Sequence, residues 1–191
     1  MITRALIFLI ETAAGLFTLA LLMRFYLQWA RAPQRNPFSD FINALTNFAV
    51  RPLRRAIPGL WGLDLASLGL AWFVQFLELF LILQLRGYEL GIAPAQSLLA
   101  MALLAVVMLL RFSLYIIIVV LIAQAVLSWV NPYSPVSPML NALARPFLRP
   151  VQRMIPPIAN VDLSPLFVVI ACQLLLMLPV AYLEGSLTRL L

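Results

Sequence analysis

Four long apolar stretches decide what this chain can fold into. They cover approximately residues 4–29, 65–85, 93–130 and 165–183. A helix needs roughly 20 predominantly apolar residues to cross the hydrocarbon core of a bilayer, and each stretch reaches about that length. Since 64% of the chain is hydrophobic and only 10% is charged, a water-soluble fold could not cover this much apolar surface. The sequence therefore predicts an all-α membrane protein with about four transmembrane helices.

The third apolar stretch is harder to interpret than the others. Residues 93–130 are too many for one crossing and too few for two crossings with a turn between them. Arg111 interrupts the stretch. We therefore expect residues 94–110 to form a tilted, partly embedded helix that leads into a span over residues 112–130. A full fifth span over residues 94–110 is the alternative, and it would invert the topology of everything after it.

The two halves of the chain repeat one another. Trp29 matches Trp129 at an offset of 100 residues, and after a two-residue adjustment the offset becomes 98. The repeated unit is a span, a proline-containing turn, an amphipathic segment, the motif Arg-Pro-x-x-Arg-x-Ile-Pro and a second span. We divide the chain into a first repeat, residues 1–92, and a second repeat, residues 93–191.

An amphipathic segment lies between the two spans of each repeat. Over residues 38–58 apolar side chains recur at the i, i+3, i+4, i+7 spacing of one helix face, and residues 136–147 show the same pattern. Ser39 is placed to cap the first of these helices, and Pro52 should break or end it near Val50. Both helices are expected to lie in the headgroup plane with their apolar faces toward the acyl chains.

Residues of four types flank these segments, and each type has a membrane-anchoring role. Tryptophan suits the interfacial aromatic belt, and arginine is attracted to anionic headgroups by about 1 kcal/mol each. Proline stops the amphipathic helix, and aspartate caps the next span. Alternatively, the two Arg-Pro-x-x-Arg turns form a docking surface for another membrane or cytoplasmic protein. The residues concerned are Trp29, Arg51, Pro52, Arg54, Arg55, Asp64, Trp129, Arg149, Pro150, Arg153 and Asp162.

The arginines also predict an orientation. All thirteen cations are Arg, and eight of them lie in the two amphipathic loops, against four at the opposite ends of the spans. The positive-inside rule then places both loops in the cytoplasm and both termini in the periplasm of a bacterial inner membrane. Because these arginines flank spans, the net charge of +6 indicates anionic headgroups as the partner and not nucleic acid.

Several polar groups lie within the spans or at their edges, where a charge is costly and suggests function. Glu11 and Glu78 are expected at similar depths, where they could bind a cation or relay a proton. The alternative is that Arg111 or water satisfies them near the interface. Arg24 can extend to the headgroups. The repeated pair Gln75 and Gln173 is expected to form hydrogen bonds between the halves, with a permeation role as the alternative. Since the first stretch carries Glu11 and Arg24 and exceeds a signal peptide's apolar core, we expect it to be retained.

The residue types of most catalytic sites are missing. The chain has no His and a single Cys, Cys172, within an apolar run. No phosphate-binding loop or dinucleotide motif occurs. We therefore expect no catalytic, metal or cofactor site.

The repeated residues resemble those of the YggT family of YlmG-like membrane proteins. The resemblance rests on Arg24-x-x-x-x-Trp29, Asn36-Pro37, residues 51–58 and Asp162-Leu163-Ser164-Pro165, and it covers about residues 5–183. It implies a multi-pass protein of the bacterial inner membrane with relatives in plastids. It also implies an association with osmotic or envelope stress tolerance and with septum, nucleoid or cytochrome-complex assembly. It implies no activity or cofactor. The second half has Gln124 where the first has Arg24, so the halves need not act identically.

Two functional hypotheses follow. The first is a non-enzymatic scaffold or assembly factor that acts through its cytoplasmic amphipathic loops, and the second is a small ion channel or transporter for osmotic adjustment. Because the chain has only four spans, the sequence is also compatible with assembly into a homo-oligomer.

Overall fold

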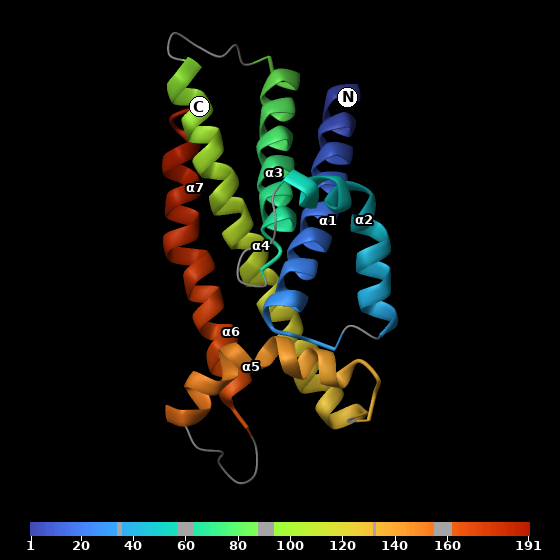
Figure 1. Cartoon of the computed structure of the whole chain (residues 1–191). Helices are drawn as coiled ribbons and strands as arrows, with labels where there is room; N and C mark the ends of the chain where they lie inside the picture. Colours follow the sequence, from blue (N-terminus) through green and yellow to red (C-terminus); the bar gives the residue numbers. More distant parts are fainter. Residues whose placement is uncertain (34–35, 57–62, 88–93, 132, 155–161) are drawn as a thin grey trace.

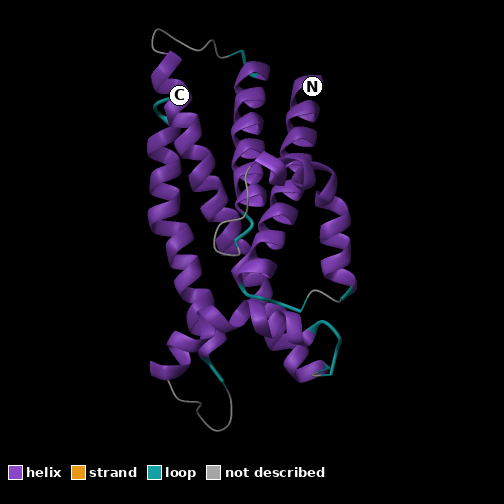
Figure 2. Ribbon diagram, viewed as in Figure 1, coloured by secondary structure: helices purple, strands orange, loops and turns teal. Residues whose placement is uncertain are grey.

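Every element of the described chain is helical. The computed structural model describes residues 1–33, 36–56, 63–87, 94–131, 133–154 and 162–191. Four segments, α1, α3, α4 and the run from α6 to α7, are long and apolar enough to cross a membrane, so the prediction of an all-α, multi-pass membrane protein is confirmed (Figure 2). The elements are α1 Ile2–Trp29, α2 Pro37–Ala56, α3 Leu65–Leu85, α4 Pro94–Val130, α5 Ser137–Met154, α6 Ser164–Leu175, the π-helical turn η1 Leu176–Val180 and α7 Ala181–Thr188.

The four long segments run alternately up and down (Figure 1). Both termini lie at one end of the bundle, and α5 crosses the opposite end. Helix α4 runs diagonally between the halves and contacts α1 and α3 on one side and α6 and α7 on the other. Half of its apolar window is buried, compared with 17–28% in the other three spans. Helix α4 therefore forms the centre of the bundle.

The third apolar stretch forms one unbroken helix. Helix α4 spans 37 residues, which is about 55 Å of helix. The predicted interruption at Arg111 and the alternative of a fifth span are both wrong. Arg111 stays within the helix because its guanidinium reaches Glu184 of α7 at 3.1 Å and lies 5.7 Å from the Tyr115 ring centroid. Its charge is thereby paired without a break, and the length is accommodated by the diagonal course.

The last span is longer than the sequence indicated. It runs from Ser164 to Thr188, and its middle contains the π-helical turn with Pro179 inside it. Proline lacks an N–H and clashes with the preceding turn, and a π-helical turn absorbs this locally. Pro165 lies in the first turn of α6, where a missing N–H costs nothing.

Two predictions for the ends of α2 are wrong. The cap is Asn36, whose side-chain oxygen accepts the Ser39 N–H at 2.9 Å, and Ser39 itself lies inside the helix. Helix α2 also continues through Pro52 to Ala56. Proline removes one backbone hydrogen bond, and the last turn is held instead by Arg54, which is paired with Asp64.

The two amphipathic helices lie differently. Helix α5 crosses the end of the bundle, where Phe147 meets Trp29 with ring centroids 5.9 Å apart. Helix α2 turns up beside α1 (Figure 1), and Phe48 stacks on Phe17 at 5.6 Å. Phe17 is twelve residues before Trp29, about 18 Å along α1. The expected in-plane orientation therefore does not describe α2, because polar contacts draw it onto α1 and α3.

Candidate functional site

A buried ion-pair cluster joins three elements of the first repeat. Asp64, just before α3, is 2% exposed, and Arg24 of α1 is 8% exposed. Arg24 Nε donates to Asp64 Oδ2 at 3.2 Å. Arg54 of α2 donates from Nη2 to the same oxygen at 2.5 Å and from Nε to Oδ1 at 3.3 Å. One carboxylate thus fixes α1, α2 and the start of α3 together.

Arg24 is held on several sides. Its Nη1 donates to the Thr46 hydroxyl at 2.8 Å and to the Asn47 side-chain oxygen at 2.9 Å. The expectation that Arg24 extends to the headgroups is therefore wrong, because Asp64 and the polar face of α2 satisfy its guanidinium inside the protein. A buried arginine needs such partners, since an unpaired charge there would be strongly unfavourable.

Asp64 has two structural tasks. It caps α3 as predicted, because its side chain accepts the Ser67 N–H at 3.3 Å and the Ser67 hydroxyl at 2.7 Å. Burial raises the pKa of the Asp64 carboxyl, but the hydrogen bonds from Arg54 and Ser67 outweigh burial, so that its pKa lies below the ordinary value. The carboxylate is therefore charged throughout the physiological range.

A polar cavity opens beside this cluster. Its volume is about 540 Å³, and it lies between the end of α1 and the polar face of α2. Three of its lining residues are arginines, and the rest are mainly amides. The lining residues are Arg24, Leu27, Gln28, Asn43, Asn47, Arg51 and Arg54.

The second repeat has a matching site of different charge. Gln124 replaces Arg24 and Gln152 replaces Arg54. Gln152 donates to Asp162 at 2.8 Å, as Arg54 does to Asp64, and Asp162 accepts the Ser164 N–H at 2.9 Å. Hydrogen bonds from Ser164 and Gln152 lower the pKa of Asp162, although burial opposes them. Both repeats therefore join the amphipathic helix to the Asp before the following span, but the two arginines of the first repeat, Arg24 and Arg54, are replaced by glutamines in the second.

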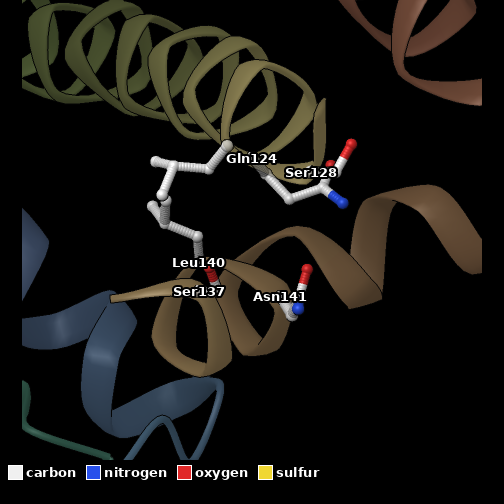
Figure 3. A pocket seen from close by; sticks show the side chains of 6 residues that line it. Gln124, Ser128, Ser137, Leu140 and Asn141 are labelled. Atoms are coloured by element: carbon white, nitrogen blue, oxygen red, sulfur yellow. The ribbon is translucent and has the colours of Figure 1, made fainter. Parts of the chain in front are cut away.

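Polar cavities also surround the second site. One of about 440 Å³ is lined by Gln124, Asn141, Arg145 and Gln152, among others. A smaller one of about 80 Å³ lies between α4, which supplies Gln124 and Ser128, and α5, which supplies Ser137 and Asn141 (Figure 3). Gln124 Oε1 and the Ser137 hydroxyl are buried there without a hydrogen-bond partner among the described residues. The second site is thus polar, lacks the two arginines that hold Asp64 in the first repeat, and is incompletely paired.

The polar groups predicted inside the spans do not gather on one path. Gln75 is 2% exposed and donates to Thr18 at 3.2 Å and to Glu78 at 2.6 Å. Glu11 lies close enough to Glu78 for their charges to interact. Gln173, however, is exposed on α6, and α3 does not contact α6. The expected hydrogen bond between the halves is therefore wrong, because α4 lies between α3 and α6.

Most of the predicted interfacial residues lie at the surface. Trp29 is 41% exposed and Trp129 is 82% exposed, which fits a place in an interfacial belt. The exception is Asp64, which is buried in the cluster, whereas the side chain of its partner Arg54 is 44% exposed. The other exposed members of the predicted set are Arg51, Pro52, Arg55, Arg149, Pro150, Arg153 and Asp162.

The residues that complete the clusters were not predicted from the sequence. They are Gln28, Thr46, Asn47 and Ser67 in the first repeat, Gln152 in the second and Glu184 opposite Arg111. A signal was available, because positions 24 and 54 are both Arg in the repeat and both matching positions, 124 and 152, are Gln. Paired exchange of two cations indicates that both face the same group.

The described residues contain no group of three or more His, Cys, Asp or Glu side chains that could hold a metal ion. The arginine cluster supplies a fixed positive charge, a rigid joint between helices and hydrogen-bond donors around a cavity. These properties suit binding and assembly.

The fold and these two matched sites define a class: polytopic helical membrane proteins built from two copies of a span–amphipathic helix–span unit. A sequence model described as CCB3/YggT matches residues 3–85 and 103–183, one segment in each repeat. The chain belongs to the CCB3/YggT family, and the resemblance inferred from its motifs is confirmed.

Relatives match over most of their length. The chain is 39% identical to an uncharacterized protein of Pseudomonas aeruginosa, over 91% of this chain and 87% of that protein. It is 35% identical to the uncharacterized protein YggT of Escherichia coli (strain K12), over 86% of this chain and 84% of that protein. An uncharacterized protein of Vibrio alginolyticus is 34% identical, over 87% of this chain and 88% of that protein. No solved structure matches the chain.

Proposed function

We propose that this protein is a non-enzymatic scaffold or assembly factor of the bacterial inner membrane, which acts through α2 and α5 on the cytoplasmic face. The observation that carries the proposal is that each helix is tied to the following span by a polar link, Arg54 to Asp64 and Gln152 to Asp162. A helix fixed in this way presents a defined surface to a partner.

Two kinds of exposed side chain favour a protein partner at these helices. Large apolar groups are exposed there, including Phe41 near the start of α2 at 62% and Met154 at the end of α5 at 82%. Exposed arginines lie close by in the sequence, namely Arg51, Arg55, Arg149 and Arg153. Apolar anchors beside arginines suit the bilayer surface together with a partner that carries acidic groups. In keeping with the family resemblance, we propose a role in tolerance of osmotic or envelope stress.

Neutralising exposed arginines tests the scaffold proposal. We expect Arg55→Gln/Arg149→Gln/Arg153→Gln to insert normally and to lose at least three quarters of its in-cell crosslinks from a photoreactive residue at position 154. The matched control is Arg4→Gln/Arg86→Gln/Arg189→Gln, which removes three exposed arginines near the opposite ends of the spans and should keep those crosslinks. Equal crosslinking by both triple variants would contradict the proposal. None of the six arginines lines the cavity beside Arg24.

One observation favours transport as a second candidate, namely the chain of polar groups formed by Thr18, Gln75 and Glu78 with Glu11 nearby. Against it, Gln75 is sealed by packing and Gln173 faces away. We expect liposomes that contain the purified protein to show no cation or proton flux above that of empty liposomes. Flux that Glu11→Gln/Glu78→Gln abolishes would replace the scaffold proposal with transport.

A further inference from the structure

We propose that the cavity lined by Arg24, Arg51 and Arg54 is a binding site for a phosphate group. The cavity has a volume of about 540 Å³, which is within the range of ligand pockets, roughly 300–1,000 Å³. It is more polar than apolar, and its walls come from α1 and α2. The inference does not depend on the scaffold function.

The charges around the cavity do not balance. Three guanidinium groups line it, and two of them, those of Arg24 and Arg54, are paired with the single carboxylate of Asp64. An excess of two positive charges remains. Arg51 is exposed and has no hydrogen-bond or ion-pair partner among the described residues. An anion with several oxygens would offset this excess.

The donors suit a tetrahedral oxyanion. Guanidinium groups bind phosphate through paired N–H donors, and such charge-assisted bonds are stronger than neutral ones. The amides of Gln28, Asn43 and Asn47 line the same wall and can donate as well. A carboxylate has two oxygens and a single charge, whereas a phosphate presents more oxygens to donors that arrive from two helices.

The site is already rigid. Arg24 is fixed by Asp64, Thr46 and Asn47, and α2 is fixed through Arg54. Binding would therefore order little of the protein, and pre-organisation of this kind favours affinity.

The position of the cavity gives the phosphate two sources. Arg24 is five residues before Trp29, about 7.5 Å along α1, and Trp29 marks the expected level of the interface. The phosphate is therefore that of an anionic lipid headgroup or of a soluble molecule that enters from the loop side.

The second repeat serves as an internal comparison. The equivalent cavity of about 440 Å³ has Gln124 and Gln152 in place of the two arginines that hold Asp64, and Arg145 is the only cation that lines it among the described residues. We expect it to bind phosphate far more weakly. The substitution Arg54→Gln gives the first repeat the residue of the second and is the natural test.

Native mass spectrometry of the purified full chain tests the lipid source, with phosphatidylglycerol compared with phosphatidylcholine at equal concentration in neutral detergent. Isothermal titration with inorganic phosphate at constant ionic strength tests the soluble source. Arg51→Gln removes a guanidinium that makes no hydrogen bond or ion pair with the described residues, so it remains informative even if Arg54→Gln weakens folding. Arg55→Gln is the matched control, because Arg55 is exposed on the same helix and does not line the cavity.

We expect one phosphatidylglycerol or one phosphate per chain, with affinity reduced about tenfold or more by Arg51→Gln and by Arg54→Gln and unchanged by Arg55→Gln. Binding of the lipid that inorganic phosphate does not displace would assign the headgroup as the source. Saturable binding of inorganic phosphate alone would assign a soluble ligand. The proposal is overturned if phosphatidylglycerol and phosphatidylcholine bind alike and phosphate does not bind, or if Arg51→Gln and Arg55→Gln bind as wild type does.

Discussion

Replacing Asp64 with Asn is expected to lower the free energy of unfolding by about 3–5 kcal/mol. The carboxylate is 2% exposed and is bonded to Arg24, which is 8% exposed. Removing one partner of a buried ion pair leaves an uncompensated charge, and losses of roughly this size result. The measurement is unfolding of the purified protein by dodecyl sulfate in mixed micelles, followed by circular dichroism.

The repeat provides the control for this prediction. Asp162→Asn changes the equivalent residue, which is exposed and bonded to the neutral Gln152, so the loss should stay below about 1 kcal/mol. The double variant Arg24→Gln/Asp64→Asn removes both buried charges and leaves the exposed Arg54, so it should recover part of the loss. If Asp64→Asn and Asp162→Asn destabilise equally, the buried ion pair is not the source of the effect.

The same carboxylate makes stability depend on pH. The pKa of Asp64 is lower in the folded protein than its ordinary value, because Arg54 and Ser67 donate to it against the effect of burial. Its contribution is therefore complete above the unfolded pKa, about 3.9, and is lost as the pH falls through the lower folded pKa. Asp64→Asn should show a smaller loss of stability between neutral pH and pH 3 than wild type does.

The spans could be predicted because their signal is local. Length and hydrophobicity alone define α1 and α3, and a single Asp before an apolar run identifies the α3 cap, since capping acts within one helical turn. The repeat added a check, because each feature had to appear twice. The main error among the spans concerned α4, where a charge at Arg111 suggested a break that pairing with Glu184 makes unnecessary.

The arginine cluster could not be derived in the same way, because its partners are distant in the sequence. Arg24 and Asp64 are 40 residues apart, and an arginine near the end of a span has a simple alternative in reaching the headgroups. Only the folded position of α2 decides between these outcomes. The course of α2 was likewise set by contacts, such as Phe48 on Phe17, which an amphipathic pattern does not specify.

Truncating Leu121 should be a strongly destabilising change at the centre of the bundle. Leu121 of α4 is fully buried, and its neighbour Ile122 is 51% exposed. In a bilayer, helix contacts and lipid are equally apolar, so a buried leucine stabilises through close packing. We expect Leu121→Ala to lower the free energy of unfolding in mixed micelles by about 2–4 kcal/mol, because the cavity left behind stays empty.

Ile122→Ala is the matched control for this change. It removes a similar number of carbon atoms one residue away, but acyl chains or detergent can fill the space, so the loss should remain below about 1 kcal/mol. Since α4 contacts both α3 of the first repeat and α6 of the second, damage at Leu121 should loosen both repeats at once. Equal losses at the two positions would mean that lipid reaches Leu121, and α4 would then not be the element that holds the two halves together.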